Sequence, residues 1–368
     1  MKVTLITSNL QSKLSFVNHA LSLKSQLPIL QNILVETDKD KLKISSTDLE
    51  IGIEVYIPSN IEEEGEVTIP AKTFIELINS ISEESITLQT DKDNLLVTSK
   101  KTRSVFQTIK SDEFPKLYKE KGEKIAVFHE EEMKRDFSSI IFASSQDTTR
   151  PALSGVLVKQ EQDGFLLVAT DGYRLSLKHH KAASGTKSEN QMIIPARVFR
   201  ELMAIKEESE DIEVYVSKES SQILFEQGDT LLIGRLIDGT FPNYEKIIPT
   251  DFSASIQFDR EELQKAVKIC SIFARDSANI IKLSLSKNEI LVSSKSPSLG
   301  ENTVKVDAML KGEENEIAFN SRYLIDVLSG ITEKELVFEM TGPLNPGVFK
   351  IKDDNSYLHL IMPVRVQG

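Results

Sequence analysis

The sequence predicts an α+β protein built from three tandem copies of one small domain, each with two helices packed on antiparallel sheets. The main observation is a repeated segment: IPAKTFIELI at residues 69–78 returns as IPARVFRELM at 194–203 and, with more differences, as FNSRYLIDVL at 319–328. Pro70, Pro195 and Asn320 are equivalent, and each step is 125 residues. A repeat of this length is the size of a small domain, so triplication is favoured over one large catalytic core.

Other landmarks keep nearly the same step. Residues 28–35 match 151–158, and residues 47–50 match 170–173, in both cases 123 residues later, while the Phe-Pro pair at 114–115 returns at 241–242. Residues 279–285 occupy the first of these places in the third copy. Polar or proline-containing stretches near residues 121–123 and 249–252 read as linkers. The predicted domains are therefore 1–122, 123–250 and 251–368.

Each copy is expected to open with a helix, at residues 10–21, 131–144 and 261–275, where apolar residues recur at helical spacing. A second helix is expected to start at the repeated Pro-Ala-Lys/Arg motif, because proline suits a first helical turn. Alternating segments between the helices predict about eight short strands per copy. Among them are residues 42–45, 52–57, 95–98, 166–169, 212–216, 289–293 and 335–340.

Composition limits the class of protein. Of the 368 residues 40% are hydrophobic, which is ample for several cores. The single cysteine, Cys270, rules out an intrachain disulfide framework and fits a reducing cytoplasm. The chain shows neither a secretion signal nor a segment of transmembrane length, so we expect a cytoplasmic protein without membrane contact. The net charge of −12 argues against nucleic acid only if the charge is spread evenly.

No catalytic set emerges from the sequence. The five histidines are scattered without zinc-ligand spacing, and no glycine-rich phosphate loop follows a strand. The sequence therefore predicts neither a metal nor a cofactor. Two segments stand out. TDGYRL at 170–175 is either a plain hairpin turn or part of a functional site. The apolar segment LHLIMPVRV at 358–366 is either a last strand or one wall of a groove that binds a partner peptide.

Together with the triple repeat, five motifs resemble those of the bacterial DNA sliding clamps, the beta subunits of DNA polymerase III. The motifs are LPIL at 27–30, RPALSG at 150–155, ATDGYRL at 169–175, DGTFPNY at 238–244 and MPVR at 362–365. The resemblance covers the whole chain. It implies a non-catalytic processivity factor, a head-to-tail homodimeric ring of DNA-clamp domains. Helices would line the hole around duplex DNA, and sheets would form the outside.

The resemblance also implies functional residues, which are expectations here. Cations facing the phosphates without reading bases would give weak, sequence-independent contacts, although each alone could be merely a solvated side chain. The expected DNA-binding residues are Lys24, Lys72, Gln146, Arg150, Arg197, Arg200, Lys206 and Lys265. The expected dimer contact joins Ile269, Ile272 and Phe273 of the third domain to Arg103 and Phe106 of the first.

The family's peptide groove would lie between the second and third domains. Its implied partners are the catalytic subunit of the replicative DNA polymerase, the clamp loader and repair proteins that carry clamp-binding motifs. The implied groove residues are Leu153, Thr170, Gly172, Tyr173, Arg174, Leu175, Pro242, Lys246, Ile247, Pro346, Val348, Leu360, Met362, Pro363, Val364 and Arg365.

Two other classes of function remain open on the sequence alone. A triplicated peptide-binding scaffold that never encircles DNA would show the same repeats. An enzyme with its site at a domain junction would use Asp171 and Arg174, but the second half of an acid–base or nucleophile set is missing. Retention on circular but not linear DNA separates the clamp from the scaffold.

Overall fold

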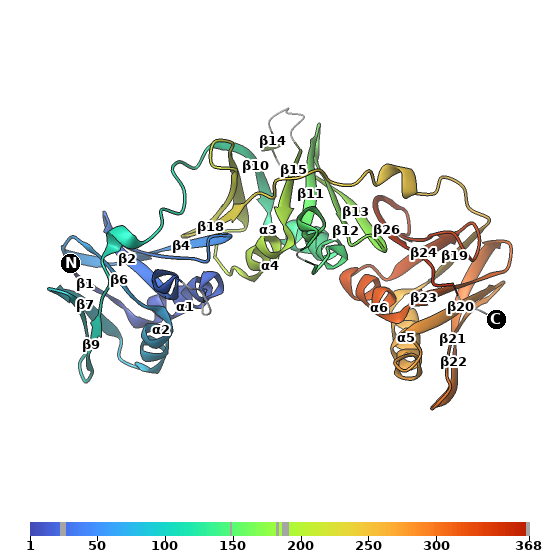
Figure 1. The fold of residues 1–368 in the computed structure, drawn as a ribbon, viewed down its shortest axis with the longest axis horizontal. Helices are drawn as coiled ribbons and strands as arrows, with labels where there is room; N and C mark the ends of the chain where they lie inside the picture. The colour runs from blue at the N-terminus through green and yellow to red at the C-terminus, as the bar shows by residue number, and fades with distance from the viewer. Residues whose placement is uncertain (23–26, 148, 182–183, 186–190, 366–368) are drawn as a thin grey trace. The chain divides into compact units, whose positions relative to one another are not determined.

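The computed structural model describes residues 1–22, 27–147, 149–181, 184–185 and 191–365. Three successive α+β repeats follow one another along the chain (Figure 1), so the predicted fold class is confirmed. Each repeat contributes two α-helices. These are α1 (Thr7–Val17) and α2 (Ala71–Ser80), α3 (Glu130–Ser138) and α4 (Ala196–Ala204), and α5 (Arg260–Ala274) and α6 (Ser321–Gly330).

The strands occupy the places where the sequence alternates. The first repeat contains β1 (Lys2–Ile6), β2 (Asn32–Asp38), β3 (Lys41–Thr47), β4 (Ile51–Pro58), β5 (Asn60–Glu63), β6 (Glu66–Pro70), β7 (Ser85–Asp91), β8 (Asn94–Thr98) and β9 (Arg103–Gln107). The second contains β10 (Glu123–His129), β11 (Gly155–Glu161), β12 (Gly164–Thr170), β13 (Arg174–Lys181), β14 (Ser184–Gly185), β15 (Gln191–Pro195), β16 (Asp211–Ser217), β17 (Gln222–Gln227) and β18 (Thr230–Arg235). The third contains β19 (Ala254–Asp259), β20 (Ile280–Ser286), β21 (Glu289–Ser296), β22 (Gly300–Gly312), β23 (Asn315–Asn320), β24 (Glu335–Met340), β25 (Gly347–Ile351) and β26 (Asp354–Ile361).

The chain divides into two compact units that do not coincide with the three repeats. The first unit comprises Met1–Glu130 and Arg197–Leu236, and the second comprises Glu131–Ala196 and Ile237–Gly368. The middle repeat is shared between them because its two sheets are each extended by a neighbouring repeat. Strand β18 pairs with β4 of the first repeat, and β13 pairs with β26 of the third.

In the first unit, β5-β1-β7-β8-β9 form one sheet and β10-β16-β17-β18-β4-β3-β2-β6 follow one another in a second. Helix α1 packs against α2 and against β4. Helix α2 also contacts the first sheet, since Phe74 of α2 meets Phe106 of β9 edge to face with ring centroids 5.8 Å apart. The helices thus cover one face of the second sheet near β4.

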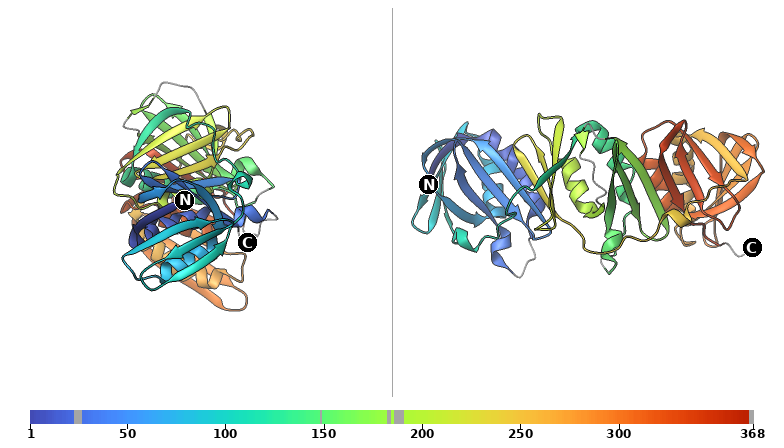
Figure 2. Two further views of the ribbon diagram at one scale, coloured as in Figure 1. Left: turned by 90° about the vertical axis from the view of Figure 1, so that its left-hand side faces the viewer. Right: turned by 90° about the horizontal axis from the view of Figure 1, so that it is seen from above.

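The second unit contains one antiparallel sheet in the order β15-β11-β12-β13-β26-β25-β24-β19-β22-β21-β20-β23. Helices α5 and α6 pack on each other and on its third-repeat strands, around a core that includes Leu263, Phe319 and Phe338. The third-repeat strands, orange to red in the right-hand view of Figure 2, lie side by side. The sheet runs without a break from the second repeat into the third, and this continuity positions the site described below.

Two details of the helices differ from expectation. Pro70 and Pro195 end strands β6 and β15, and the helices begin one residue later, because each proline is the strand partner of a residue in the neighbouring strand. The first two opening helices are also shorter than predicted, since short 3₁₀ turns follow α1 and α3, whereas α5 has the predicted length and begins one residue earlier. Among the described residues, no helix has both the length and the apolar character needed to cross a bilayer.

Candidate functional site

The turn between β12 and β13 is fixed by its own side chains. Thr170 Oγ1 donates a hydrogen bond to the carbonyl of Arg174 at 2.6 Å. Asp171 Oδ1 accepts from the backbone N–H groups of Tyr173 and Arg174 at 2.9 and 3.0 Å. Gly172 takes a φ of 92°, a conformation that favours glycine. Tyr173 is 63% exposed, while Arg174 turns inward. TDGYRL is therefore a hairpin turn between the paired strands β12 and β13, and its own side chains stabilise it.

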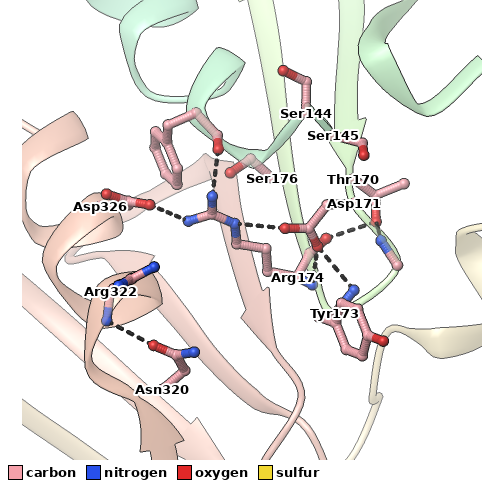
Figure 3. Close-up of polar contacts among 12 residues, drawn as sticks. Ser144, Ser145, Thr170, Asp171, Tyr173, Arg174, Ser176, Asn320, Arg322 and Asp326 are labelled. Atoms are coloured by element: carbon pink, nitrogen blue, oxygen red, sulfur yellow. Dashed lines mark hydrogen bonds and ion pairs between the residues drawn. The ribbon is translucent and has the colours of Figure 1, made fainter. Parts of the chain in front are cut away.

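Arg174 links the second repeat to the third. Its guanidinium contacts Asp171 at 3.1 Å and Asp326 of α6 at 2.6 Å, and it donates to the carbonyl of Phe142 at 2.7 Å (Figure 3). It also lies over the Tyr323 ring, 4.5 Å from the centroid. Only 9% of the side chain is exposed. The buried Arg174 guanidinium thus links the turn to α6 through ion pairs with Asp171 and Asp326; we call these contacts the arginine tie.

Residues 358–365, the last that the structure describes, lie beside this turn. Strand β26 pairs with β13, so Leu360 is opposite Leu175. Beyond the strand, the backbone N–H of Met362 donates to the carbonyl of Tyr173 at 2.9 Å, and that of Val364 donates to Ala318 at 2.8 Å. The structure therefore contains both features that the sequence left open: a closing strand, and an ordered apolar extension next to the turn.

Apolar side chains gather on the sheet between the turn and the chain end. Of the expected groove residues, Leu175, Val348 and Leu360 belong to this cluster and are fully buried. The other buried members are Leu157, Leu166, Val168, Ile193 and Tyr244, with Ala152, Leu177, Ile237, Phe241, Ile248, Phe252 and Leu358 packed against them while partly exposed. We call this set the second-junction cluster. Sequence reasoning missed most of it, although the alternation Leu175–Leu177 and Leu166–Val168 could have identified residues on one face.

The remaining groove residues surround the cluster at different depths. Leu153 is buried, and Pro346, Pro363 and Val364 are half-buried. Ile247 and Met362 are exposed apolar side chains. Pro242, Lys246 and Arg365 are exposed as well. The floor expected from the sequence is therefore inaccessible, and the surface available to a partner is formed by its rim.

Burial shapes the electrostatics around this region. The imidazole of His359 is buried, and its Nδ1 lies 2.6 Å from Ser176 Oγ. Burial, with the Arg174 cation as a second cause, lowers the pKa of His359 well below its usual range. Burial likewise raises the pKa of the Tyr244 hydroxyl. The charged groups here are Arg174 with its partners Asp171 and Asp326, and the exposed Lys246 and Arg365 at the rim.

The expected DNA-binding cations lie in both units. Lys72 on α2, Arg200 on α4, Lys206 after α4 and Lys265 on α5 are all exposed, as are Gln146 and Arg150. Arg197 is engaged within the first unit, because its guanidinium contacts Asp48 and donates to the carbonyl of His19. Lys24 lies outside the described residues. An Arg197–phosphate contact would have to compete with Asp48.

The expected dimer residues differ in accessibility. Ile269 and Ile272 of α5 are 45% and 53% exposed, Phe273 is half-buried and Arg103 is exposed. Phe106 instead packs into the core against Phe74, and its neighbour Val105 points outward. Two open sheet edges belong to these same regions, although β5, β6, β14, β15 and β23 are also end strands of the described sheets. Among the described strands, β9 pairs along its length only with β8, and residues 300–307 of β22 pair only with β21.

Three family matches run along the chain. Residues 1–118, 128–243 and 245–365 match the N-terminal, central and C-terminal domains of the DNA polymerase III beta subunit. The beta sliding clamp of Staphylococcus aureus is 30% identical over 358 residues, covering 94% of each chain. That of Synechocystis is 28% identical and covers all of both chains.

Solved structures agree with these matches. The sliding clamp of Bacillus subtilis superposes with a TM-score of 0.95 at 28% identity, covering all of both chains. A sliding clamp of Pseudomonas aeruginosa bound to griselimycin superposes with a TM-score of 0.93 at 25% identity, again over all of both chains. The likeness therefore extends over the whole fold as well as the separate domains.

Proposed function

Because the chain belongs to the family of DNA polymerase III beta subunits, the beta sliding clamps, we propose that it encircles duplex DNA as a homodimeric ring and tethers the replicative polymerase. The observation that carries this proposal is the run of three family domains through the chain, with two open sheet edges at opposite repeats. The domains are 1–122, 123–250 and 251–368, as the repeat suggests. The protein acts in the cytoplasm as a topological tether and not as a catalyst.

Open edges in the first and third repeats support the proposed dimer. Inside the chain, each repeat extends its neighbour's sheet, through β18 on β4 and β13 on β26. Pairing β9 of one subunit with residues 300–307 of the other would extend a third sheet in the same way and cover exposed edges. Ile269 and Ile272 would then be buried next to this contact together with Val105. Two chains of three repeats complete a ring of six.

Contacts with DNA would be made by exposed cations on helices. Lys72, Arg200 and Lys265 lie on helices of different repeats and are free to face phosphates. Such contacts are weak, depend on salt and carry no sequence information, which suits a protein that slides. The net charge of −12 limits non-specific attraction elsewhere on the surface. Lys24, Lys206, Gln146 and Arg150 complete the proposed set.

Partners would dock at the rim of the second-junction cluster. Tyr173, Ile247 and Met362 offer exposed apolar surface around a rigid turn, and Leu177 and Phe241 are partly exposed beside it. An extended segment with apolar anchors fits such a surface, with backbone bonds and a few polar contacts fixing its direction. The proposed ligands are short motifs of the polymerase catalytic subunit, the clamp loader and repair proteins.

Encirclement is tested by loading the protein onto nicked circular plasmid with a clamp loader. The protein should stay with circular DNA during gel filtration and leave after the plasmid is linearised.

Replacing Ile269 and Ile272 by Ala removes exposed side chains only, so the fold should persist. The dimer should be weakened by about 3–6 kcal/mol, and retention should be lost. Equal retention on linear and circular DNA would leave the non-encircling scaffold as the better description.

The docking site is tested separately by ending the chain after Ile361, which preserves strand β26. The truncated protein should lose affinity for polymerase-derived peptides in calorimetry while keeping its retention on circular DNA. A Tyr173→Ala variant should weaken the same peptides, because the exposed ring lies at the rim. Unchanged peptide affinity in both variants would place the docking site elsewhere.

A further inference from the structure

The first repeat contains a cavity at the place equivalent to the second-junction cluster. The cavity has a volume of about 460 Å³ and is lined by β2, β3, β4 and β6 and by a covering segment, residues 111–118. That segment contains Phe114-Pro115, the counterpart of Phe241-Pro242 in the second repeat. We call this space the first-junction cavity. Its volume is in the range of small-ligand sites.

The floor of the cavity is polar where the second repeat is apolar. At the 123-residue step, Lys43, Ser45 and Glu54 occupy the places of Leu166, Val168 and Leu177. Strand pairing brings these three to one face, because Ser45 lies opposite both Glu54 and Leu34. Leu117 of the covering segment closes one end of the cavity. It packs closely on Gly52, because a Cβ added to Gly52 would lie 3.2 Å from the Cδ1 atom of Leu117. The covering segment is anchored by a 2.7 Å hydrogen bond from Gln222 to the carbonyl of Leu117.

The Ser45 hydroxyl is buried without a partner. The residue is 1% exposed and lines the cavity, and its Oγ makes no hydrogen bond. A buried hydroxyl of this kind normally costs free energy until a partner satisfies it. By contrast, Glu54 is fully engaged, since it accepts from the hydroxyls of Tyr56 and Tyr118 and lies 3.1 Å from Lys43. The unmet hydrogen-bonding capacity of the floor is therefore located at Ser45.

The cavity has more negative than positive charge. Glu36, Glu54, Glu66 and Asp112 line it against Lys43 and Lys116, a difference of two negative charges. The single ammonium group of Lys43 forms ion pairs with two carboxylates, that of Glu54 at 3.1 Å and that of Glu36 at 3.5 Å. Burial, and then the nearby Glu54 and Glu66, raise the pKa of Glu36. A second cation in the cavity would relieve this excess.

We propose that the first-junction cavity binds the ammonium or guanidinium group of an organic cation, with Ser45 Oγ and Glu36 as acceptors. The ammonium group has three donors and no acceptor, which complements a floor that offers a free hydroxyl oxygen and an under-neutralised carboxylate. The walls formed by Leu34, Phe114 and Pro115 suit the methylene stem of such a group. An anion would be repelled. This site is separate from partner docking and DNA encirclement.

The same chemistry could come from a free amine or from a lysine side chain of a peptide. Calorimetric titration of the full-length protein therefore uses 1,5-diaminopentane in one arm and a lysine blocked at both backbone ends in the other. Saturable binding of one ligand per chain in either arm supports the site. The tighter of the two ligands, by about tenfold or more, identifies the source.

Variants decide whether binding takes place in this cavity. Glu36→Gln and Ser45→Ala should each weaken binding about tenfold, since each removes one acceptor. Glu64→Gln is the matched control, because it removes the same charge from an exposed carboxylate of the same repeat outside the cavity lining. Equal weakening by Glu64→Gln would reduce the effect to general attraction by an acidic protein and overturn the proposal. Saturable binding of acetate would also overturn it. So would titrations unchanged by both cavity variants, whose folding is checked by their melting temperatures.

Discussion

The two junctions between repeats have the same backbone plan and opposite chemistry. On strand β13 of the second junction, Leu175 and Leu177 face the apolar cluster, while Ser176, Lys178 and His180 are buried on the other face. On strand β4 of the first junction, the equivalent Glu54 lines the cavity and Gly52 lies against Leu117 of the covering segment, while Ile53, Val55 and Ile57 are buried. The register of the two strand pairs is also equivalent, since Leu232 lies opposite Ile53 where His359 lies opposite Ser176.

This inversion shows that strand pairing, and not a conserved core, defines the repeat. Side chains alternate between the two faces of a strand, so exchanging polar and apolar positions leaves the backbone plan unchanged. At the second junction the buried polar side chains find partners, because Asp136 lies 2.8 Å from His180 and Lys178 bonds Ser356 at 2.7 Å. The opposite face carries the apolar second-junction cluster, of which only the rim is exposed. At the first junction the arrangement is reversed, and the accessible face becomes polar.

The strongest test of the comparison is the arginine tie. Arg174→Ala should reduce the free energy of unfolding by about 3–5 kcal/mol, because it leaves the Asp171 carboxylate, only 14% exposed, and the carbonyl of Phe142 without their buried partner. Arg197 is the first-junction counterpart, since it holds Asp48 of the equivalent turn, but it is partly exposed. Arg197→Ala should cost only about 1 kcal/mol. Urea unfolding at fixed protein concentration measures both, and equal losses would show that the two ties are equivalent.

The sequence could predict the elements that depend on local pattern. The 123- and 125-residue steps locate the repeats, and alternation locates β24 at residues 335–340 to the residue. The sequence alone could not show that Phe106 packs into its own domain while Val105 faces outward. In an edge strand that carries neighbouring aromatic and aliphatic residues, either side chain could be the one that faces the core. The sequence also left Arg197 as a free cation, since its partner Asp48 lies 149 residues away.

The candidate site divides in the same way. The turn chemistry of Thr170 and Asp171 is encoded within five residues and could be read as a turn. The second-junction cluster depends on strands from two repeats, and Val348 and Leu360 join it only through tertiary pairing. The polar cavity was missed because Lys43 and Glu54 look like ordinary solvated residues until the covering segment is in place.

Exchanging the equivalent residues Ser45 and Val168 is the second test. Val168→Ser should destabilise the protein by about 2–4 kcal/mol, because it removes buried methyl groups and adds a hydroxyl in an apolar cluster. Ser45→Val should be neutral or stabilising by about 1 kcal/mol, because it removes an unpaired hydroxyl beside free volume. Urea unfolding without added amine measures both. A clear loss of stability in Ser45→Val would mean that the hydroxyl already has a partner.

Acid sensitivity is the third test, because only the second junction contains the buried Ser176–His359 pair. Burial lowers the pKa of His359, so the folded state keeps the imidazole neutral while the unfolded chain takes up a proton near pH 6.5. The stability contributed by this residue is complete above pH 6.5. It falls as the pH decreases, by up to about 1.4 kcal/mol per pH unit, until the folded-state pKa is reached.

The double variant Ser176→Ala with His359→Leu imitates the apolar pair of the first junction and should flatten this part of the pH profile. Unfolding by urea at pH 7.5, 6.5 and 5.5 provides the comparison. Hydrogen exchange of β13 and β26 should increase at pH 5.5 in the native sequence beyond the intrinsic effect of pH, while that of β4 and β18 should not. A native profile as flat as that of the double variant would contradict the role of His359.

The smallest expected effect lies in the two equivalent turns. Leu49 and Gly172 occupy the same position, with φ values of 77° and 92°. Side chains rarely adopt this conformation, and it costs a non-glycine residue roughly 1–2 kcal/mol. Gly172→Ala should therefore reduce the free energy of unfolding by about 1 kcal/mol, with no steric contribution, since the nearest atom to an added Cβ is 3.9 Å away.

Leu49→Gly relieves the same strain but increases the entropy of the unfolded chain, so its net gain in the free energy of unfolding should be smaller, about 0.5 kcal/mol. Because Leu49 is exposed, its removal creates no cavity that would mask the gain. Melting temperatures that shift in opposite directions would show that both turns share one backbone conformation, whereas a loss in Leu49→Gly would mean that this side chain makes a stabilising contact of its own.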